Sequence, residues 1–213
     1  RICLVGSEMC IRDRFYSDLK YNPDYTSVIN QKHYDRLNGL LSDAKDHGAK
    51  LVEINPANED FSQQESHKIP PTLVLNPTDE MQIMKEEIFG PLLPIKTYKD
   101  INEPINYINK NDKPLGLYYF GNNKNEEAKV VNSTTSGGVT VNDIMGHIQQ
   151  NELGFGGVGP SGMGKYDGFD GFMNFSNNKP IYKQIGFGLD KLLDAIRPPY
   201  KGSIEDVLKK LLK

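Results

Sequence analysis

A regular pattern of apolar and polar positions lies between Asn30 and Gly48, where apolar residues recur every three or four positions. That spacing places them on one face of an α-helix. Asn30 or Ser27 can cap the start of this helix, and Gly48 supplies a stop at its end. The apolar positions are Tyr34, Leu37, Leu40, Leu41 and Ala44. We therefore predict an amphipathic helix over residues 30–48.

Short apolar stretches alternate with further helical patterns along the rest of the chain. Stretches typical of strands cover residues 49–54, 68–76, 92–98, 115–120 and 138–142. Helical patterns lie between them at residues 77–86, 101–109 and 122–134. Polar or aromatic text that predicts loops covers residues 15–28 and 55–67. This alternation predicts an α/β fold whose strands pair in parallel.

Composition is that of an ordinary globular protein. The chain has 213 residues, a net charge of -3 and 37% hydrophobic residues, which suits one or two domains with a real core. The mild acidity, without long basic runs, argues against nucleic acid as the main partner. No apolar run approaches the roughly 18–20 residues of a membrane span, and we expect a cytoplasmic protein. His33, His47 and His67 lack the spacing of metal ligands, so we predict solvated histidines and no metal site.

Both cysteines, Cys3 and Cys10, lie within the first 14 residues. The run Leu-Val-Gly-Ser-Glu-Met-Cys-Ile-Arg-Asp resembles the in-frame translation of a transposase-type sequencing-library adapter. It is not a signal peptide, because it has neither a basic start nor a continuous apolar core of adequate length. We expect residues 1–14 to be an assembly artefact and the reading frame to be truncated upstream of Phe15. The authentic part would then contain no cysteine, and so no disulfide and no thiol nucleophile.

Residues 85–91 read Lys-Glu-Glu-Ile-Phe-Gly-Pro and lie between a helical pattern and a strand pattern. The Gly-Pro step breaks a helix and fixes the backbone, so it presents Glu87 and Phe89 from a defined turn. A carboxylate beside an aromatic ring suits a ribose diol and a flat heteroaromatic ring. On spacing alone, a helix C-terminus followed by a core phenylalanine is an equally good interpretation.

A glycine-rich segment near residue 155 formally matches two nucleotide-binding motifs. Residues 154–159 have the spacing of the dinucleotide fingerprint, and residues 159–165 have that of a phosphate loop. The fingerprint needs a preceding strand and a helix that opens at it, whereas residues 147–152 are polar. The phosphate loop requires Ser or Thr where Tyr166 stands. The glycines are better explained by a backbone that passes close to a pocket or turns with positive φ.

Several ordered blocks of sequence carry a resemblance to a known family. The most specific blocks are residues 86–91, 113–118, 136–143 and 155–164, and the matching text runs from Val28 to about Gln184. Together they resemble the C-terminal part of the aldehyde dehydrogenase superfamily. The nearest branch is the one that holds the class 3, fatty-aldehyde and coniferyl-aldehyde dehydrogenases.

This resemblance implies a domain organisation. Residues 15–171 would be the C-terminal portion of an aldehyde dehydrogenase catalytic domain, with a parallel-sheet α/β fold. Residues 172–184 would form an oligomerisation strand that pairs with a neighbouring subunit in a homodimer, as an exposed strand edge usually has a partner. Residues 185–213 would be a tail with short helices over 185–196 and 204–212.

The resemblance also implies NAD(P)-dependent oxidation of an aryl or long-chain aldehyde, of the coniferyl aldehyde type, through a cysteine thiohemiacetal. Glu87 would bind the hydroxyls of the nicotinamide ribose, and Phe89 would hold the nicotinamide ring. The channel for the small-molecule aldehyde would be lined by Asn142, Met145, Ile148 and Phe155. Core packing is the alternative for these four residues.

The nucleophilic cysteine and the general-base glutamate would both lie upstream of Phe15, so no catalytic residue is expected in this fragment, which would be inactive alone. Where relatives have Tyr-His-Gly, this chain has Asp167 in place of the histidine, which gives the rim a more acidic character. Two alternatives stay open. One is a non-catalytic oligomerising subunit or pseudoenzyme, and the other is a nucleotide-binding module that uses the glycine-rich loop.

Overall fold

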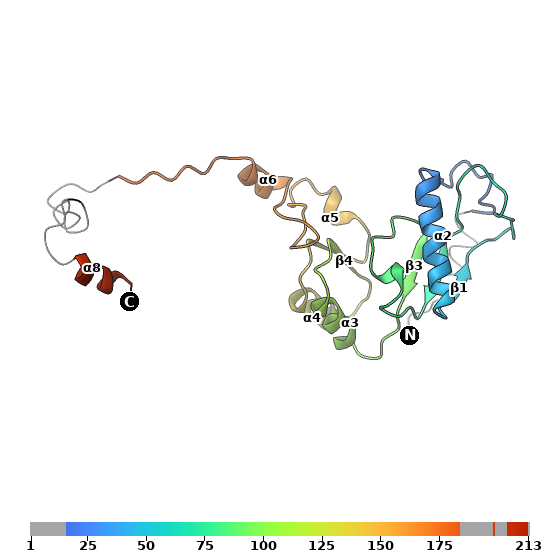
Figure 1. Cartoon of the computed structure of the whole chain (residues 1–213), viewed down its shortest axis with the longest axis horizontal. Coiled ribbons are helices and arrows are strands. Elements are labelled where there is room, and N and C mark those ends of the chain that lie inside the picture. The colour runs from blue at the N-terminus through green and yellow to red at the C-terminus, as the bar shows by residue number, and fades with distance from the viewer. Residues whose placement is uncertain (1–15, 184–197, 199–203, 213) are drawn as a thin grey trace. The chain divides into compact units, whose positions relative to one another are not determined.

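The computed structural model describes residues 16–183, 198 and 204–212, and the chain divides into two compact units, residues 1–104 and 105–213. The predicted adapter with Cys3 and Cys10, and the predicted helix over 185–196, lie outside the described residues. Helix α8 spans Ile204–Leu211, close to the predicted bounds of 204–212. Figure 1 labels the elements for which there is room, among them α2, β1 and β3.

The first unit is built around helix α2, Gln31–Asp46, as the apolar periodicity predicts. The Asn30 side chain accepts a hydrogen bond from the His33 backbone N–H at 3.0 Å, so Asn30 is the cap. Strands β1 (Lys50–Glu53), β2 (Thr72–Leu75) and β3 (Leu92–Ile95) form one sheet in the order β1-β2-β3. Because α2 buries its apolar face against this sheet, the helix and the strands share one core.

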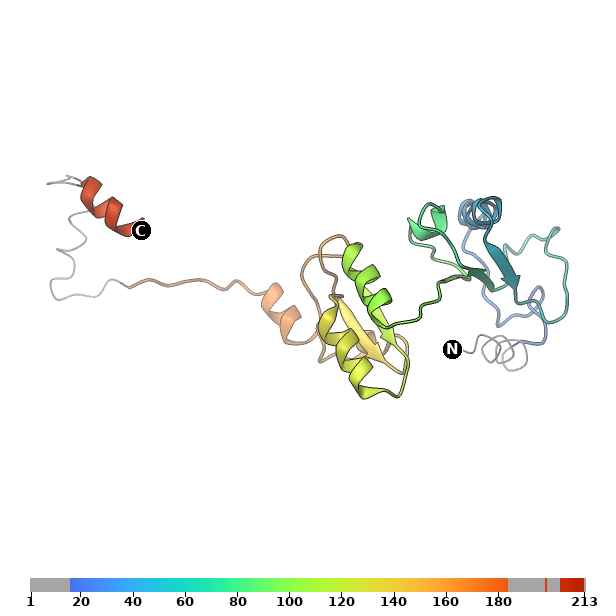
Figure 2. The same ribbon diagram turned by 90° about the horizontal axis from the view of Figure 1, so that it is seen from below.

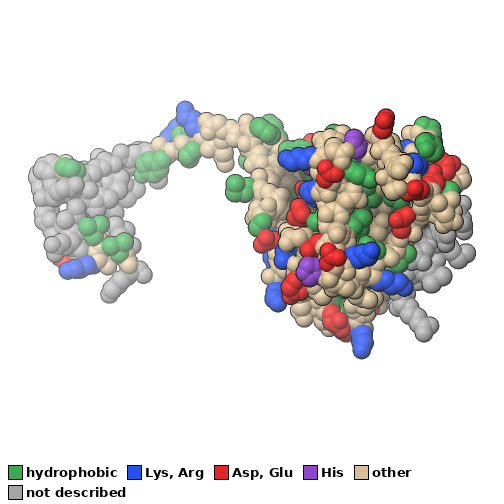
Figure 3. All heavy atoms as spheres, turned by 45° about the vertical axis from the view of Figure 1, so that its right-hand side comes forward, with side chains coloured by type: hydrophobic (Ala, Val, Ile, Leu, Met, Phe, Trp, Pro, Cys, Tyr) green, Lys and Arg blue, Asp and Glu red, His purple; other side chains and the backbone are tan. Residues whose placement is uncertain are grey.

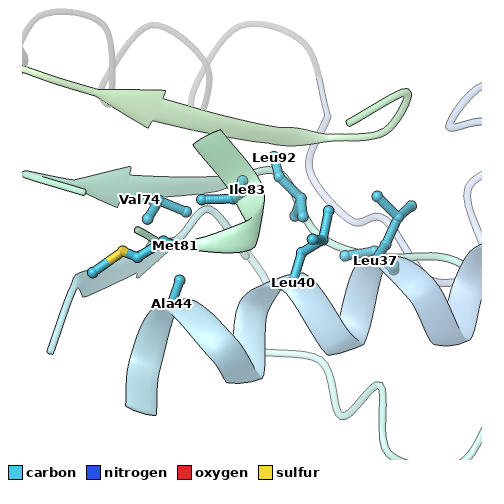
Figure 4. Close-up of a cluster of buried hydrophobic side chains, with 8 residues drawn as sticks. Leu37, Leu40, Ala44, Val74, Met81, Ile83 and Leu92 are labelled. Carbon is cyan, nitrogen blue, oxygen red and sulfur yellow. The ribbon is translucent and has the colours of Figure 1, made fainter. Parts of the chain in front are cut away.

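The core of this unit lies between α2 and the sheet, as Figure 4 shows. Side chains from the helix meet side chains from β2, from the start of β3 and from the segment between these strands. The buried members are Leu37, Leu40, Ala44, Ile69, Val74, Met81, Ile83 and Leu92. At about 25 cal/mol per Å² of apolar area removed from water, a cluster of this size is the main favourable term for folding this unit.

Two expectations for this unit need correction. Strands β2 and β3 pair in parallel, in the register Thr72↔Leu92, but β1 runs antiparallel to β2. The connection from β1 to β2 is a loop, and an antiparallel neighbour needs no crossover helix. The predicted helix over residues 77–86 is only the 3₁₀ turn η1, Gln82–Met84. Met81, just before this turn, has an extended backbone and a side chain that is 1% exposed. Burial of this side chain therefore takes precedence over continuation of a helix.

The second unit contains a parallel pair of strands with helices beside it. Strands β4 (Gly116–Tyr119) and β5 (Gly138–Val141) pair in the register Gly116↔Gly138. Helices α3 (Asn102–Lys110) and α4 (Lys124–Ser133) lie side by side against this pair in both ribbon views (Figures 1 and 2). The Asn109 side-chain amide links them by donating to the Ser133 carbonyl at 2.7 Å. Together with β2 and β3, this pair confirms the predicted α/β fold with parallel elements.

Two short helices follow β5 in the second unit, α5 (Gly146–Gln149) and α6 (Gly168–Asn174). The predicted strand over 172–184 is therefore wrong at residues 172–174, which are helical. The Phe175 N–H bonds to the Gly171 carbonyl at 3.1 Å, so the backbone groups here close a helical turn. Residues 177–183 have no regular secondary structure in the single chain, and their pairing with a second subunit stays a prediction.

The surface and the helices add two observations. Acidic and basic side chains are interspersed on the face shown in Figure 3, without a large patch of one sign. Within the described ranges, no helix combines the length and the apolar character needed to cross a membrane.

Candidate functional site

The segment 86–91 is a turn that leads directly into β3. Phe89 has φ 47°, a left-handed backbone that costs energy for an aromatic residue, and its side chain is 83% exposed. Glu87 is exposed as well. A Cβ added at Gly90 would lie 2.6 Å from Leu37 Cδ1, so a larger residue there would force this buried leucine to shift. The turn therefore presents both predicted cofactor residues to solvent, and the alternative of a core phenylalanine is wrong.

A cavity of about 900 Å³ lies beside this turn, within the first unit. Its walls include Glu87 and Phe89 from the turn, Arg36 from α2, and Tyr16 and Tyr25 from the segment before the helix. The Tyr25 hydroxyl donates to the Ile69 carbonyl at 2.6 Å. Burial raises the pKa of the Tyr25 phenol well above its usual value, and the neighbouring Tyr16 raises it further. The Tyr25 side chain is thus neutral over the physiological pH range.

The segment that forms this wall is held by two charged side chains from the loop between β1 and β2. Lys68 is 7% exposed, and its Nζ donates to the Leu19 and Asn22 carbonyls at 3.2 and 2.6 Å. The Glu59 carboxylate accepts from the Leu19 N–H at 2.6 Å and from the Lys20 N–H at 3.0 Å. Because both charged side chains bond to backbone groups, they fix residues 19–22 to the loop between β1 and β2.

In the second unit, Asn142 closes the end of the parallel strand pair. It lies one residue beyond β5, with φ 57°, rather than inside the predicted strand. Its Nδ2 donates to the Gly121 carbonyl at 3.0 Å, and its Oδ1 accepts from the Gly121 N–H at 2.8 Å. Asn142 therefore joins the residues after β5 to those after β4.

The other three predicted channel residues gather around His147. The His147 ring lies 5.8 Å from the Tyr118 ring and 6.2 Å from the Phe155 ring. The Tyr118 hydroxyl contacts Met145 Sδ at 3.6 Å, and the Ile148 N–H bonds to the Met145 carbonyl at 2.9 Å. Met145 is 47% exposed, whereas Ile148 and Phe155 are half-buried. Simple core packing thus does not account for Met145.

His147 itself is not among the candidate residues predicted from the sequence. It is 8% exposed, and the Thr140 hydroxyl bonds both to its Nδ1 at 2.7 Å and to its backbone N–H at 3.1 Å. Its Nε2 is buried and has no hydrogen-bond partner within the described part of the chain. Helical spacing of apolar residues could not reveal it, because α5 is only four residues long. A histidine seven positions after a threonine in a strand is too weak a sequence signal to predict that the two side chains are in contact.

The glycine-rich segment forms a closed loop rather than the start of a helix. Phe155 and Tyr166 bond to each other through both backbone groups, at 2.7 and 2.9 Å, and their rings meet edge-on at 5.3 Å. A Cβ at Gly157 would lie 2.2 Å from the Ser161 carbonyl carbon, and Gly159 has φ 63°. The glycines therefore allow close approach and positive φ, as predicted. Within residues 154–165 no helix opens, so neither nucleotide motif has its required structure.

Candidate residues with titratable side chains do not form a metal centre. Among the described residues, no group of three or more His, Cys, Asp or Glu could hold a metal ion. Asp167 is exposed and precedes α6 with φ 65°, and its side chain does not cap that helix. The structure thus offers two separate groups of candidate residues, Glu87 with Phe89 in one unit and those around His147 in the other.

Comparison with known proteins agrees with these observations. The family model described as "Aldehyde dehydrogenase family" matches residues 14–181. A probable coniferyl aldehyde dehydrogenase of Caulobacter vibrioides is 52% identical over 195 residues, and a coniferyl aldehyde dehydrogenase of a Pseudomonas species is 48% identical over 197 residues. Each alignment covers 92% of this chain and 40% of the relative, so the chain spans two fifths of their length.

A solved structure gives the same result for the fold. The substrate-bound structure of Staphylococcus aureus AldH matches with a TM-score of 0.71 at 34% identity. The match covers 99% of this chain and 43% of that one.

Proposed function

Because the chain belongs to the aldehyde dehydrogenase family, we propose that it is the C-terminal part of an NAD(P)-dependent enzyme that oxidises an aryl or long-chain aldehyde to the carboxylic acid. Coniferyl aldehyde is the proposed substrate type, because relatives that are 52% and 48% identical carry that name. The 40% coverage of these relatives supports the view that the active enzyme is longer than this chain. We propose a cytoplasmic homodimer that pairs through residues 177–183, a part of the predicted strand that is not helical in the single chain.

The observation that carries this proposal is the exposed pair Glu87 and Phe89 on the wall of the cavity. A carboxylate can accept hydrogen bonds from both hydroxyls of a ribose, and an exposed phenyl face can hold a flat ring. The two side chains therefore fit the nicotinamide riboside half of NAD(P). When bound, this cofactor supplies the hydride acceptor for aldehyde oxidation.

In this proposal the chain's own residues act by positioning. Glu87 would fix the ribose and Phe89 the ring, which restricts the cofactor to a productive orientation, an effect that can be worth several kcal/mol of barrier. Asn142, Met145, Ile148 and Phe155 would line the aldehyde channel. The thiolate nucleophile and the general base are proposed to belong to the part of the protein upstream of Phe15.

The first experiment is a genomic read across the 5′ side of the Phe15 codon, followed by expression of the longest reading frame found. We expect a segment with Gly-Gln-x-Cys and NAD(P)-dependent turnover of coniferyl aldehyde, with hexadecanal as the comparison substrate. Glu87→Gln should raise the KM for the cofactor about tenfold, as expected for a lost charge-assisted hydrogen bond. The exposed Glu65 of the same unit provides the matched control, Glu65→Gln.

Other outcomes would favour a different function. A start codon directly before Phe15 would leave a cysteine-free chain and would favour the non-catalytic oligomerising subunit. Turnover by the 213-residue chain alone would contradict the proposed upstream location of the catalytic cysteine. Micromolar affinity of that chain for ATP as well as NAD would favour the nucleotide-binding module.

A further inference from the structure

Arg36 joins helix α2 to the turn that carries Glu87 and Phe89. Its guanidinium donates to the Glu87 carbonyl at 3.1 Å and to the Ile88 carbonyl at 2.5 Å, and it lies 3.4 Å from the Glu86 carboxylate. These contacts reach three consecutive residues that lie fifty or more positions away in the sequence. The Arg36 side chain is 27% exposed, so the contacts are partly shielded from water.

The chemistry of these contacts favours arginine over lysine. A guanidinium is a rigid planar fork, and here two of its nitrogens each meet one of two successive carbonyls. Such bonds are charge-assisted and stronger than bonds between neutral groups. The ion pair with Glu86 contributes less, because the Glu86 side chain is 43% exposed. The carbonyl contacts are therefore the main part of the interaction.

The turn needs such support because its backbone is strained. Phe89 has φ 47°, and a left-handed conformation at a residue with a Cβ persists only where its surroundings impose it. Leu37, next to Arg36 on α2, presses against Gly90. At the far end of the turn, the Pro91 carbonyl accepts from the Thr72 N–H of β2 at 2.9 Å.

Helix α2 also holds the segment on the other side of the turn. The Asp43 carboxylate accepts from the Gln82 N–H at the start of η1, at 2.8 Å. Because α2 is packed against the buried core, it is a rigid support for the turn and for the start of η1, which both bond to it. Through Arg36, α2 also makes a polar contact with the turn itself, at Ile88, one residue before the strained Phe89.

We propose that Arg36 is a positioning residue that imposes the backbone of the turn and so aims Glu87 and Phe89 at the nicotinamide cofactor. The link to the cofactor rests on the proposed function, whereas the control of the turn does not. Arg36 lines the same cavity as Glu87 and Phe89, so its loss would alter the wall on which both stand.

The first test uses the 213-residue chain and needs no activity. Amide hydrogen exchange of residues 86–90 is compared between the unmodified chain, Arg36→Gln, Arg36→Lys and the control Lys32→Gln, which removes an exposed cation from the same helix. We expect exchange in the turn to be on the order of tenfold faster in Arg36→Gln, to be intermediate in Arg36→Lys, and to be unchanged in Lys32→Gln. Protection of Leu37 and Val74 in the core should stay the same.

Contrary results would overturn the proposal. Equal exchange of the turn in Arg36→Gln and Lys32→Gln would show that Arg36 does not order it. Full protection in Arg36→Lys would show that charge alone acts and that the fork on two carbonyls is irrelevant. Should Arg36→Gln loosen the whole unit, Arg36→Lys decides: loss confined to residues 86–90 supports the proposal, and loss throughout the unit overturns it.

The second test uses the longest enzyme that the gene encodes. Arg36→Gln should raise the KM for the cofactor about tenfold and leave the KM for the aldehyde unchanged, and Lys32→Gln should change neither. Glu87→Gln separates the two proposals. If Glu87→Gln raises the cofactor KM and Arg36→Gln does not, the role of Arg36 fails alone. If neither does while the turn loosens in Arg36→Gln, the cofactor role of the turn fails and Arg36 still orders the turn.

Discussion

The two compact units of the chain bury very different amounts of apolar side chain. In the described part of the first unit, the buried hydrophobic residues are Leu19, Leu37, Leu40, Ala44, Ile54, Ile69, Leu73, Val74, Met81, Ile83 and Leu92. In the described part of the second unit they are Ile105 and Val130. Strand β5 is half-buried at all four positions, although parallel strands are usually covered on both faces.

This difference shows two ways of fixing candidate functional residues. In the first unit, the turn with Glu87 and Phe89 stands on a helix whose apolar side chains fill the core and whose Arg36 bonds to the turn. In the second unit, polar contacts connect the candidate residues to the strands. Asn142 bonds to Gly121, and Thr140 bonds to His147. One substitution in each unit, at a buried leucine of the core or at the Thr140 hydroxyl, tests this difference.

The largest effect is expected for Leu37→Ala. Leu37 is fully buried, so the substitution leaves a cavity and should lower the free energy of unfolding of the first unit by about 2–5 kcal/mol. Urea unfolding followed by amide exchange in each unit measures this change. The control is Leu93→Ala, the same deletion at a position of β3 that is 56% exposed, for which we expect a change within about 0.5 kcal/mol. Equal losses in the two variants would refute the view that packing at α2 fixes this unit.

A smaller effect is expected for Thr140→Val, which keeps the shape of the side chain and removes its hydroxyl. The buried His147 then loses the partner of its Nδ1 and of its backbone N–H, which should cost about 1–3 kcal/mol. Thr140→Ser restores the hydroxyl and should recover most of the loss. Exchange protection of β4 and β5 is the measurement. An unchanged Thr140→Val would mean that apolar contacts alone hold the second unit.

Much of the fold follows from the sequence, because many of its elements are marked by signals in their own residues. Helix α2 has a helical period and a capping residue, and the Gly-Pro step marks the turn that exposes Glu87 and Phe89. The helix predicted over 77–86 is wrong because its helical pattern gives no sign that Met81 is buried with an extended backbone. The strand predicted at residues 172–174 is wrong because it rests on a resemblance, whereas the single chain closes a helical turn there.

The site was less predictable than the fold. Arg36 and the turn are separated by fifty positions, and the sequence around either one gives no indication that the two are in contact. His147 lies in a helix too short to show a period, and its partner Thr140 is an ordinary strand residue. Such contacts arise only when distant elements pack, so one sequence without its structure gives the exposed residues of a site and not those that hold them.

The smallest predicted effect is in the wall of the cavity of the first unit, at Tyr25. Its hydroxyl donates to the Ile69 carbonyl, so Tyr25→Phe should cost about 1 kcal/mol at neutral pH, while Tyr21→Phe, at an 82% exposed position, should cost nothing measurable. The sign of the pH dependence follows from the raised pKa of Tyr25, which burial causes. Above about pH 10 an unfolded tyrosine loses its proton while the folded one keeps it. The unfolded state then binds fewer protons at this position, so the stability that Tyr25 contributes is constant below that pH and falls above it. Urea unfolding from pH 8 to 11 should show a shallower fall in Tyr25→Phe than in the unmodified chain, and parallel curves would place the Tyr25 hydroxyl in water rather than against Ile69.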